Sequence, residues 1–219
     1  MMKIFAWILD LIFPPKCVLC ERILEKDQTD LCHECRVNSP EHPMPKNKRQ
    51  FLKSWTALWY YEDRVRDSIL RYKFAGCRYY CIPYGRLLAM KIQKDMDDSY
   101  DVLTWVPVSK RRKRRRGYDQ VELLAQEVGK ELDIQPIKCL NKIRNNKPQS
   151  GIVNEAKRRA NVLGVYEVTN RDAFLGKRVL ILDDVITTGA TVGECARMLL
   201  TAGAKEVHCA ALAAAHHQK

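Results

Sequence analysis

The sequence has no apolar run that approaches the roughly 18 residues a membrane-spanning helix needs. It also has fewer acidic than basic residues, 26 against 38, which gives a formal net charge of +12. The first absence argues against a membrane-spanning class. The second indicates a nucleic acid, an anionic lipid or a polyphosphate as partner. The apolar fraction of 46% is ordinary for a globular protein, and 219 residues suffice for one α/β domain with a small appendage.

A signal-peptide cleavage site is also missing. The apolar residues 4–9 follow Lys3, but Asp10 interrupts them and no small-residue site comes after. The apolar positions match one face of a short amphipathic helix, at Ile4, Trp7, Ile8, Leu11 and Ile12. We expect this helix to dock on the body of the protein, with a partner protein or a membrane surface as alternatives. We expect the protein to be cytoplasmic.

Four cysteines form two C-x-x-C pairs separated by eleven residues: Cys17 with Cys20, and Cys32 with Cys35. Two such turns direct four thiolates at one point, which suits tetrahedral Zn²⁺. A disulfide framework needs an oxidising compartment, which the missing signal peptide argues against, and an iron–sulfur cluster is a third option. His33 could replace one cysteine. We expect a structural Zn²⁺ that staples a segment too small for a core of its own.

The remainder divides into a linker and a main domain. Residues 37–53 contain three prolines among basic residues, which predicts an exposed linker. We therefore assign residues 1–50 to an N-terminal unit of helix, zinc knuckle and linker, and residues 51–219 to the main domain. Apolar patterning there predicts strands near 55–61, 101–108, 178–183 and 206–213, alternating with helices as a parallel sheet requires. The remaining cysteines lack paired spacing and are expected to be buried free thiols: Cys77, Cys81, Cys139, Cys195 and Cys209.

The stretch from Val179 to Thr191 carries the strongest functional signal. It begins as an unbroken aliphatic run, which is typical of a strand buried on both faces of a parallel sheet. Asp183 and Asp184 end the run, and a loop of threonines and glycine leads into a helix. Backbone N–H groups and the positive helix end suit a phosphate, and Gly189 permits its close approach. The two acids repel phosphate and suit sugar hydroxyls or a hydrated Mg²⁺.

This stretch resembles the motif with which type I phosphoribosyltransferases bind phosphoribosyl pyrophosphate (PRPP). The resemblance implies that the loop holds the 5′-phosphate of PRPP, that the two acids face its ribose, and that Mg²⁺ accompanies the ligand. The implied PRPP-binding residues are Asp183, Asp184, Thr187, Thr188, Gly189, Ala190 and Thr191.

Seven consecutive basic residues, Lys110 to Arg116, follow the predicted strand that ends near Val108. Because they repel one another, the run needs anions or solvent around it. One pyrophosphate can occupy only one or two of these side chains, so the surplus indicates a polyanion such as single-stranded DNA. Tyr118 follows where a base could stack.

Together, the cysteine pairs, the Val-Pro-Val strand, the R-R-G-[FY]-[ND]-Q segment and the C-terminal loop are similar to the ComF family of bacterial late competence proteins. Residues 70–76 and 149–164 fit as well, so the resemblance covers nearly the whole chain. The departures are small. Ser109 stands where that family often has Pro, Tyr118 where it has Phe, and Asp119 where it has Asn.

The resemblance also assigns roles around the loop. By similarity to amidophosphoribosyltransferase-like domains, the turn after Val108 would be a pyrophosphate loop, and residues 142–165 would be a mobile flap. The residues implied to contact pyrophosphate or nucleic acid are Lys110, Arg111, Arg112, Arg115 and Arg116.

We therefore expect a type I phosphoribosyltransferase-like α/β fold, with a parallel sheet, flanking helices and a small N-terminal zinc knuckle. Two functions compete. The first is a PRPP-binding protein that handles single-stranded DNA, together with DNA-uptake partner proteins, during natural transformation. The second is a working phosphoribosyltransferase with an unidentified acceptor. The sequence shows no base-recognition segment and names no catalytic residue, so whether PRPP is turned over stays open.

Overall fold

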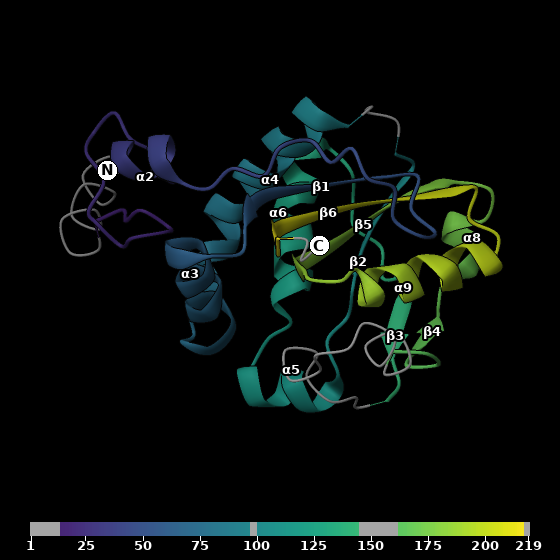
Figure 1. Ribbon diagram of the computed structural model, residues 1–219. Coiled ribbons are helices and arrows are strands. Elements are labelled where there is room, and N and C mark those ends of the chain that lie inside the picture. The colour runs from purple at the N-terminus through teal and green to yellow at the C-terminus, as the bar shows by residue number, and fades with distance from the viewer. Residues whose placement is uncertain (1–13, 97–99, 145–161, 217–219) are drawn as a thin grey trace, which may run out of the picture.

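A computed structural model describes residues 14–96, 100–144 and 162–216 (Figure 1). The predicted N-terminal amphipathic helix and most of the predicted flap lie outside these residues, so both stay predictions. Among the described residues, no helix has the length and apolar composition that crossing a membrane requires.

The centre of the structure is a parallel sheet in the order β1-β6-β5-β2. Its strands are β1 (Ser54–Tyr60), β2 (Val102–Trp105), β5 (Arg178–Ile186) and β6 (Glu206–Ala214). A separate antiparallel pair is formed by β3 (Leu140–Lys142) and β4 (Tyr166–Val168). The predicted fold, a parallel sheet with flanking helices, is confirmed.

Helices cover both faces of this sheet (Figure 1). The described helices are α2 (His33–Asn38), α3 (Asp63–Phe74), η1 (Arg78–Tyr80), α4 (Cys81–Asp95), α5 (Lys110–Arg116), α6 (Gln120–Leu132), α8 (Arg171–Phe174) and α9 (Ala190–Thr201). Because side chains alternate along a strand, Leu180 and Leu182 pack in the core that contains α4 and α6. Val179 and Ile181 pack on the other face, with α9.

The cysteine knuckle packs into the same core as α3 and α4. The hydroxyl of Ser68 on α3 donates to the carbonyl of Val18, and Arg71 Nη2 donates to Leu19 O at 2.6 Å. Both carbonyls belong to the first C-x-x-C turn. Helix α3 is therefore fastened to the knuckle through the backbone between Cys17 and Cys20.

Most of residues 37–53 are exposed, as expected of a linker, but part of the segment packs along the sheet. His42 N donates to Leu58 O at 3.1 Å, and Tyr60 N donates to Pro40 O at 2.7 Å, so the backbone runs along β1. His42 is buried, and Lys91 of α4 donates to its carbonyl at 2.8 Å. Prolines remove backbone donors, but the neighbouring N–H and C=O groups still pair with the edge strand.

The basic run after Val108 is also not a loop: Lys110–Arg116 form helix α5. The side chain of Ser109 caps it by accepting from Arg112 N, and Gly117 ends it in the left-handed conformation with φ of 81°. Arginine and lysine are good helix formers, and their repulsion is eased by solvent and by an ion pair of 2.7 Å between Lys113 and Glu122. Local capping thus outweighs like-charge repulsion.

Candidate functional site

Most of the predicted functional residues meet in one cleft of about 490 Å³ at the carboxyl ends of β2 and β5. Open α/β sheets bind their ligands at this edge. Elements far apart in the chain contribute to its walls. The lining residues that matter for the chemistry are Lys73, Phe74, Arg112, Arg115, Arg116, Gln120, Lys142, Tyr166, Asp183, Asp184, Thr187, Gly189 and Thr191.

The two acids at the end of β5 point to opposite faces of the sheet. Asp184 Oδ1 accepts from Lys73 Nζ of α3 at 2.8 Å, and its Oδ2 accepts from Gln120 Nε2 of α6 at 2.6 Å. Asp183 faces the α9 side. There the positive charge of Lys142 acts to lower the pKa of Asp183, and the charge of Asp183 acts to raise the pKa of the buried thiol Cys195. The alternation of side chains along a strand therefore gives neighbouring carboxylates different surroundings.

These surroundings separate the ionisation of the two acids. Burial raises the pKa of Asp183 to about 8, and the negative charge of Asp184 adds to the effect. Burial also disfavours the charged form of Asp184, but the charge and hydrogen bond of Lys73 outweigh it, so the pKa of Asp184 lies below its usual range. The surroundings thus favour the protonated form of Asp183 and the charged form of Asp184.

We expect Asp183→Asn to stabilise the protein at high pH. The pKa of Asp183 is higher in the folded than in the unfolded chain, so the folded protein binds its proton more tightly and stability falls as pH rises from about 4 to about 8. Asparagine does not titrate. Wild type should lose on the order of 3–4 kcal/mol of unfolding free energy relative to the variant between about pH 5 and about pH 8. Urea unfolding across this range measures the difference, and a constant difference would refute the buried, protonated Asp183.

The threonine and glycine loop leads into α9 as expected. Gly189 is the N-cap residue, with φ of 81°, and the 12 residues of α9 follow it. Thr188 Oγ1 accepts from Ala190 N at 3.4 Å, so its hydroxyl is engaged within the loop, whereas Thr187 and Thr191 line the cleft. The positive end of the helix and two threonine side chains thus meet at the cleft, an arrangement that suits an anion.

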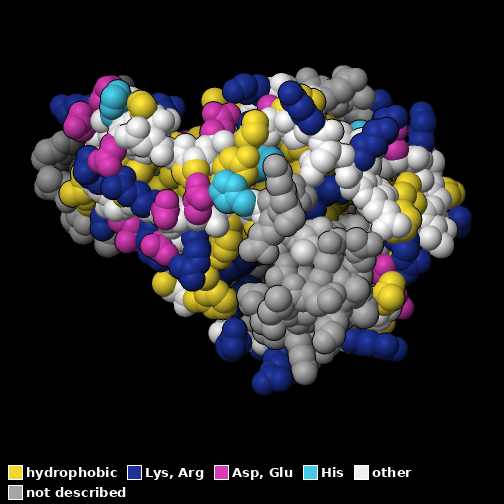
Figure 2. Space-filling view, in the orientation of Figure 1, with side chains coloured by type: hydrophobic (Ala, Val, Ile, Leu, Met, Phe, Trp, Pro, Cys, Tyr) yellow, Lys and Arg dark blue, Asp and Glu magenta, His cyan; other side chains and the backbone are white. Residues whose placement is uncertain are grey.

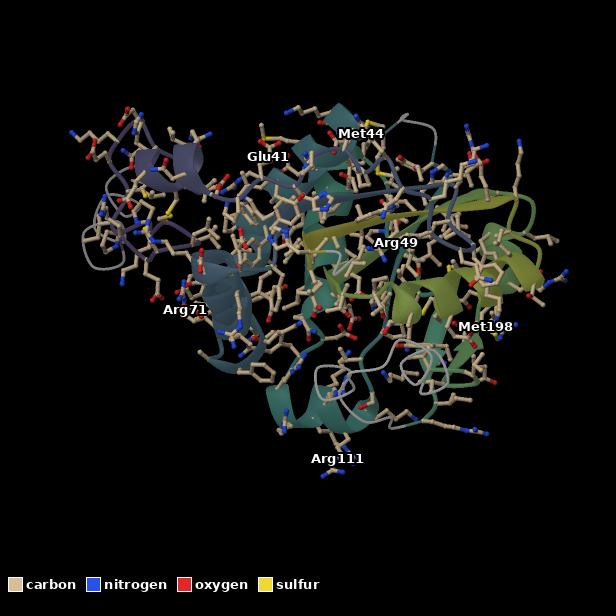
Figure 3. The ribbon with its side chains drawn as sticks, in the orientation of Figure 1. Glu41, Met44, Arg49, Arg71, Arg111 and Met198 are labelled. Atoms are coloured by element: carbon tan, nitrogen blue, oxygen red, sulfur yellow. The ribbon has the colours of Figure 1, made fainter. Side chains whose placement is uncertain are left out.

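Helix α5 presents two basic faces. Arg112, Arg115 and Arg116 line the cleft, whereas Lys110 and Arg111 are exposed and do not line it. Arg111 points away from the body of the protein (Figure 3), and Lys and Arg side chains project from this edge of the surface (Figure 2). Of the five residues predicted to contact pyrophosphate or nucleic acid, three therefore line the cleft and two lie exposed outside it.

Arg116 links α5 to the acid pair. Its Nη1 donates to Gln120 Oε1 at 2.6 Å, and the same Gln120 side chain donates to Asp184. Its guanidinium carbon lies 4.7 Å from the centre of the Phe74 ring, which is 57% exposed. Burial lowers the pKa of Arg116, but an arginine stays charged at any ordinary pH.

Three residues where the chain departs from the family pattern have structural roles. Ser109 caps α5, and the carboxylate of Asp119 caps α6 by accepting from Val121 N and Glu122 N at 3.0 and 3.2 Å. Tyr118 is buried and its hydroxyl donates to the carbonyl of Tyr72. The expectation that Tyr118 stacks on a base is therefore wrong. Phe74 is the exposed ring next to the basic helix.

Sequence reasoning missed Lys73, Gln120, Lys142 and Tyr166 as cleft residues. Lys142 Nζ donates to Tyr166 Oη at 3.3 Å, across the β3–β4 pair. Burial lowers the pKa of Lys142 to about 8, and the charge of Arg112 adds to the effect. Lys73 lies in the segment 70–76 that supported the family resemblance, but that resemblance named no ligand for it. Nothing local in the sequence indicates that these side chains converge.

The four knuckle cysteines form a cluster that fits Zn²⁺. Their sulfur atoms lie within 4.8 Å of one another, and Cys20 Sγ and Cys32 Sγ are 3.6 Å apart. Zn–S bonds of about 2.3 Å give a tetrahedron with edges of about 3.8 Å. His33 is exposed and lies outside the cluster, so Cys17, Cys20, Cys32 and Cys35 supply the donors.

A residue of the main domain supports this metal site. Arg64, in the first turn of α3, donates to Glu34 Oε1 at 2.6 Å and to Cys35 Sγ at 3.8 Å. A guanidinium beside a thiolate partly offsets the negative charge that four thiolates leave on a divalent ion. The residues present therefore suit a structural Zn²⁺ with its outer partners in place.

Comparison with known families assigns both parts of the chain. The family model of the double zinc ribbon domain matches residues 8–45, and that of the phosphoribosyl transferase domain matches residues 115–219. The first match contains the four-cysteine cluster. The second contains Arg115, Arg116, the acid pair and the loop of residues 187–191.

Curated relatives match over most of the chain. Competence protein F of Haemophilus influenzae is 25% identical over 91% of this chain and 97% of its own length. Competence protein ComFC of Bacillus subtilis is 25% identical over 85% of this chain and 78% of its own. The DNA utilization protein YhgH of Escherichia coli K12 is 27% identical over 87% and 86%. The chain thus combines a double zinc ribbon and a phosphoribosyl transferase domain with similarity, over most of its length, to the ComF and ComFC competence proteins.

Proposed function

We propose that this protein binds PRPP, or a related phosphoribosyl ligand, in the cleft at the end of β5, and that it handles single-stranded DNA in the cytoplasm during DNA uptake. The observation that carries the proposal is the joining of three features in one cleft: an acid pair, a phosphate loop at a helix end, and the arginine face of α5. Each feature matches one part of PRPP.

The charge of each part of the cleft indicates which part of PRPP binds there. The loop of Thr187, Gly189 and Thr191 receives the 5′-phosphate at the N-terminus of α9. The carboxylate of Asp184 accepts hydrogen bonds from ribose hydroxyls, and Lys73 keeps it ionised. The pyrophosphate lies toward Arg112 and Arg115, whose guanidinium groups bind phosphate oxygens in pairs.

Mg²⁺ would reach the cleft with the pyrophosphate. A divalent ion near Asp183 favours the charged carboxylate, so binding of Mg²⁺ and PRPP at neutral pH should release a proton from this group. Calorimetry of PRPP binding in buffers of different ionisation enthalpy, with and without Mg²⁺, tests the ligand and this proton together. Ribose 5-phosphate and AMP should compete. Absence of PRPP binding with Mg²⁺ present would contradict the proposed function.

The outer face of α5 supports the DNA part of the proposal. Lys110, Arg111 and Arg114 are exposed, and Lys110 and Arg111 do not line the cleft, so they are available to a second polyanion while the inner arginines hold PRPP. Relatives named for competence and for DNA utilization are consistent with nucleic acid as that polyanion.

We expect two double variants of α5 to separate the ligands. Lys110→Ala with Arg111→Ala should reduce the salt slope of single-stranded DNA binding by about 1.4, since each lost phosphate contact removes about 0.7, and should leave PRPP affinity unchanged. Arg112→Ala with Arg115→Ala removes the same charge and should weaken PRPP binding about tenfold or more. Fluorescence anisotropy of a labelled oligonucleotide across a salt series gives the slopes. An unaltered slope in the outer variant would end the assignment of DNA to α5.

A working transferase is the second candidate, and the protonated Asp183 favours it. A buried carboxyl group that titrates near pH 8 can exchange a proton with a ligand at neutral pH. Consumption of PRPP with release of pyrophosphate, followed across nucleobase and amine acceptors, tests this function. PRPP that stays intact with all acceptors leaves binding as the function of the cleft.

A further inference from the structure

The ring of Phe74 lies exposed in the cleft. Phe74 is the last residue of α3, and it is 57% exposed. Of the large apolar side chains that are exposed in the described part of the chain, Phe74 alone lines the cleft. A ring stabilises a fold through the surface that it buries, so a ring left in an open cleft contributes little to folding. Exposed aromatic rings in clefts are instead typical of ligand sites.

The two residues before Phe74 fix the position of its ring. Tyr72 Oη donates to Gln120 O at 2.5 Å, and Lys73 Nζ donates to Asp184 Oδ1 at 2.8 Å. These bonds hold the last turn of α3 against α6 and β5, and Phe74 follows directly in the same turn. Because the backbone that carries the ring is already ordered, a ligand that binds to it pays less conformational entropy.

The guanidinium of Arg116 covers part of this ring. Its Cζ lies 4.7 Å from the centre of the Phe74 ring, and its Nη1 donates to Gln120 Oε1 at 2.6 Å, so the guanidinium is held in place from both sides. The exposure of Phe74 shows that much of the ring remains accessible beside Arg116. Nucleobases stack on phenylalanine rings and on guanidinium planes. The pair of Phe74 and Arg116 therefore suits a planar base better than an aliphatic group.

The part of the cleft wall next to Phe74 is also apolar. Leu70 lies one turn earlier on the same face of α3, and it lines the cleft together with Tyr61 and Val185. All three are half-buried, so each keeps some surface for a ligand. The wall that α5 contributes carries arginines instead. A ligand with phosphates and an apolar planar group therefore places its phosphates toward α5 and α9, and its planar group toward α3.

We propose that Phe74 and the neighbouring wall of α3 form a stacking subsite for a nucleobase, so that the cleft accepts a nucleoside 5′-phosphate as well as PRPP. The inference rests on the proposed function of the cleft, in which Asp184 binds the ribose. Asp184 pairs with Lys73, the residue next to Phe74, so a base carried on that ribose is within reach of the ring. A sugar phosphate without a base leaves the ring uncovered.

A comparison of AMP with ribose 5-phosphate isolates the base, because both ligands carry a ribose and a 5′-phosphate. Calorimetry on the full-length wild-type chain should give an affinity for AMP about tenfold higher than that for ribose 5-phosphate. Phe74→Ala should lose most of this preference and keep the affinity for ribose 5-phosphate. Phe74→Tyr should keep the preference, since it keeps a ring. Phe74→Leu should lose it, since leucine fills similar space without stacking.

The matched control is Tyr79→Ala. Tyr79 is 58% exposed but does not line the cleft, so this variant should keep both affinities. Circular dichroism confirms that each variant folds. Fluorescence anisotropy of a labelled oligonucleotide identifies the source of the base. If single-stranded DNA supplies it, Phe74→Ala weakens oligonucleotide binding and AMP displaces the oligonucleotide from wild type. If a free nucleotide supplies it, oligonucleotide binding is the same in Phe74→Ala and wild type.

Three results would overturn the inference and leave the proposed function intact. The first is equal affinity of wild type for AMP and ribose 5-phosphate. The second is an equal loss of both ligands in Phe74→Ala, which would show that the ring only shapes the cleft. The third is an undiminished preference for AMP in Phe74→Leu, which would exclude stacking. If wild type binds neither ribose 5-phosphate nor PRPP, the proposed function itself fails.

Discussion

Asp184→Asn should abolish most PRPP binding and destabilise the protein at the same time. The change leaves Lys73 without its carboxylate partner at a position where the two side chains are only 16% and 11% exposed. Breaking such a pair should cost about 2–3 kcal/mol of unfolding free energy, which lowers the melting temperature by about 5–10 °C. The lost charged hydrogen bonds to ribose should reduce PRPP affinity about a hundredfold.

Asp183→Asn is the matched control, because it changes the neighbouring acid and leaves the pair of Asp184 and Lys73 in place. The surroundings of Asp183 favour its protonated form, so an asparagine should keep the fold. Calorimetry should show weaker PRPP binding only when Mg²⁺ is present. Equal stability of Asp184→Asn and wild type, or equal PRPP affinity, would show that the pair with Lys73 does not organise the cleft.

Removal of zinc should lower the stability of the whole molecule by at least as much as Asp184→Asn does. Structural zinc sites contribute about 10–16 kcal/mol in isolated fingers, and the knuckle here shares its core with α3 and α4. We expect Cys35→Ser to lose zinc and to lower the melting temperature by more than about 10 °C. PRPP affinity should also fall, because α3 carries both Arg64 at the knuckle and Lys73 at the cleft.

The control for this variant is Cys77→Ser, since Cys77 lies outside the four-cysteine cluster. It should retain one zinc per chain by elemental analysis and melt near wild type. Wild type purified without chelator should contain the metal. Zinc-free wild-type protein that melts at the same temperature as the zinc-containing protein would refute a structural zinc site.

The sequence predicted the parts of the site that lie in one continuous segment. The aliphatic run before Asp183 indicated a strand buried on both faces, and the following loop indicated a phosphate site; the strand, loop and helix all occur there. The same alternation implies that neighbouring acids point apart, so that their separate environments were already present in the pattern. The pattern does not show which residue each acid contacts.

Partners distant in the chain could not be predicted, because nothing local encodes them. Lys73 and Asp184 are 111 positions apart, and their contact depends on how α3 packs beside β5. Arg49 was assigned to an exposed linker because that segment contains several prolines and basic residues. Tertiary packing instead places Arg49 against Gly189. For α5, the local signals existed in Ser109 and Gly117, and the charge of the run concealed them.

Strand β6 sits between β1 and β5, although it follows both in the chain. In a growing polypeptide that has not yet produced β6, no strand joins β1 to β5. The sheet therefore cannot be completed until the last part of the chain has been synthesised. The walls of the cleft come from both sides of that gap, because Lys73 follows β1 in the chain and Asp184 lies on β5. Ligand binding should therefore appear only after residues 206–214 have emerged from the ribosome, and truncation before them should yield a chain with two open strand edges that is prone to aggregate.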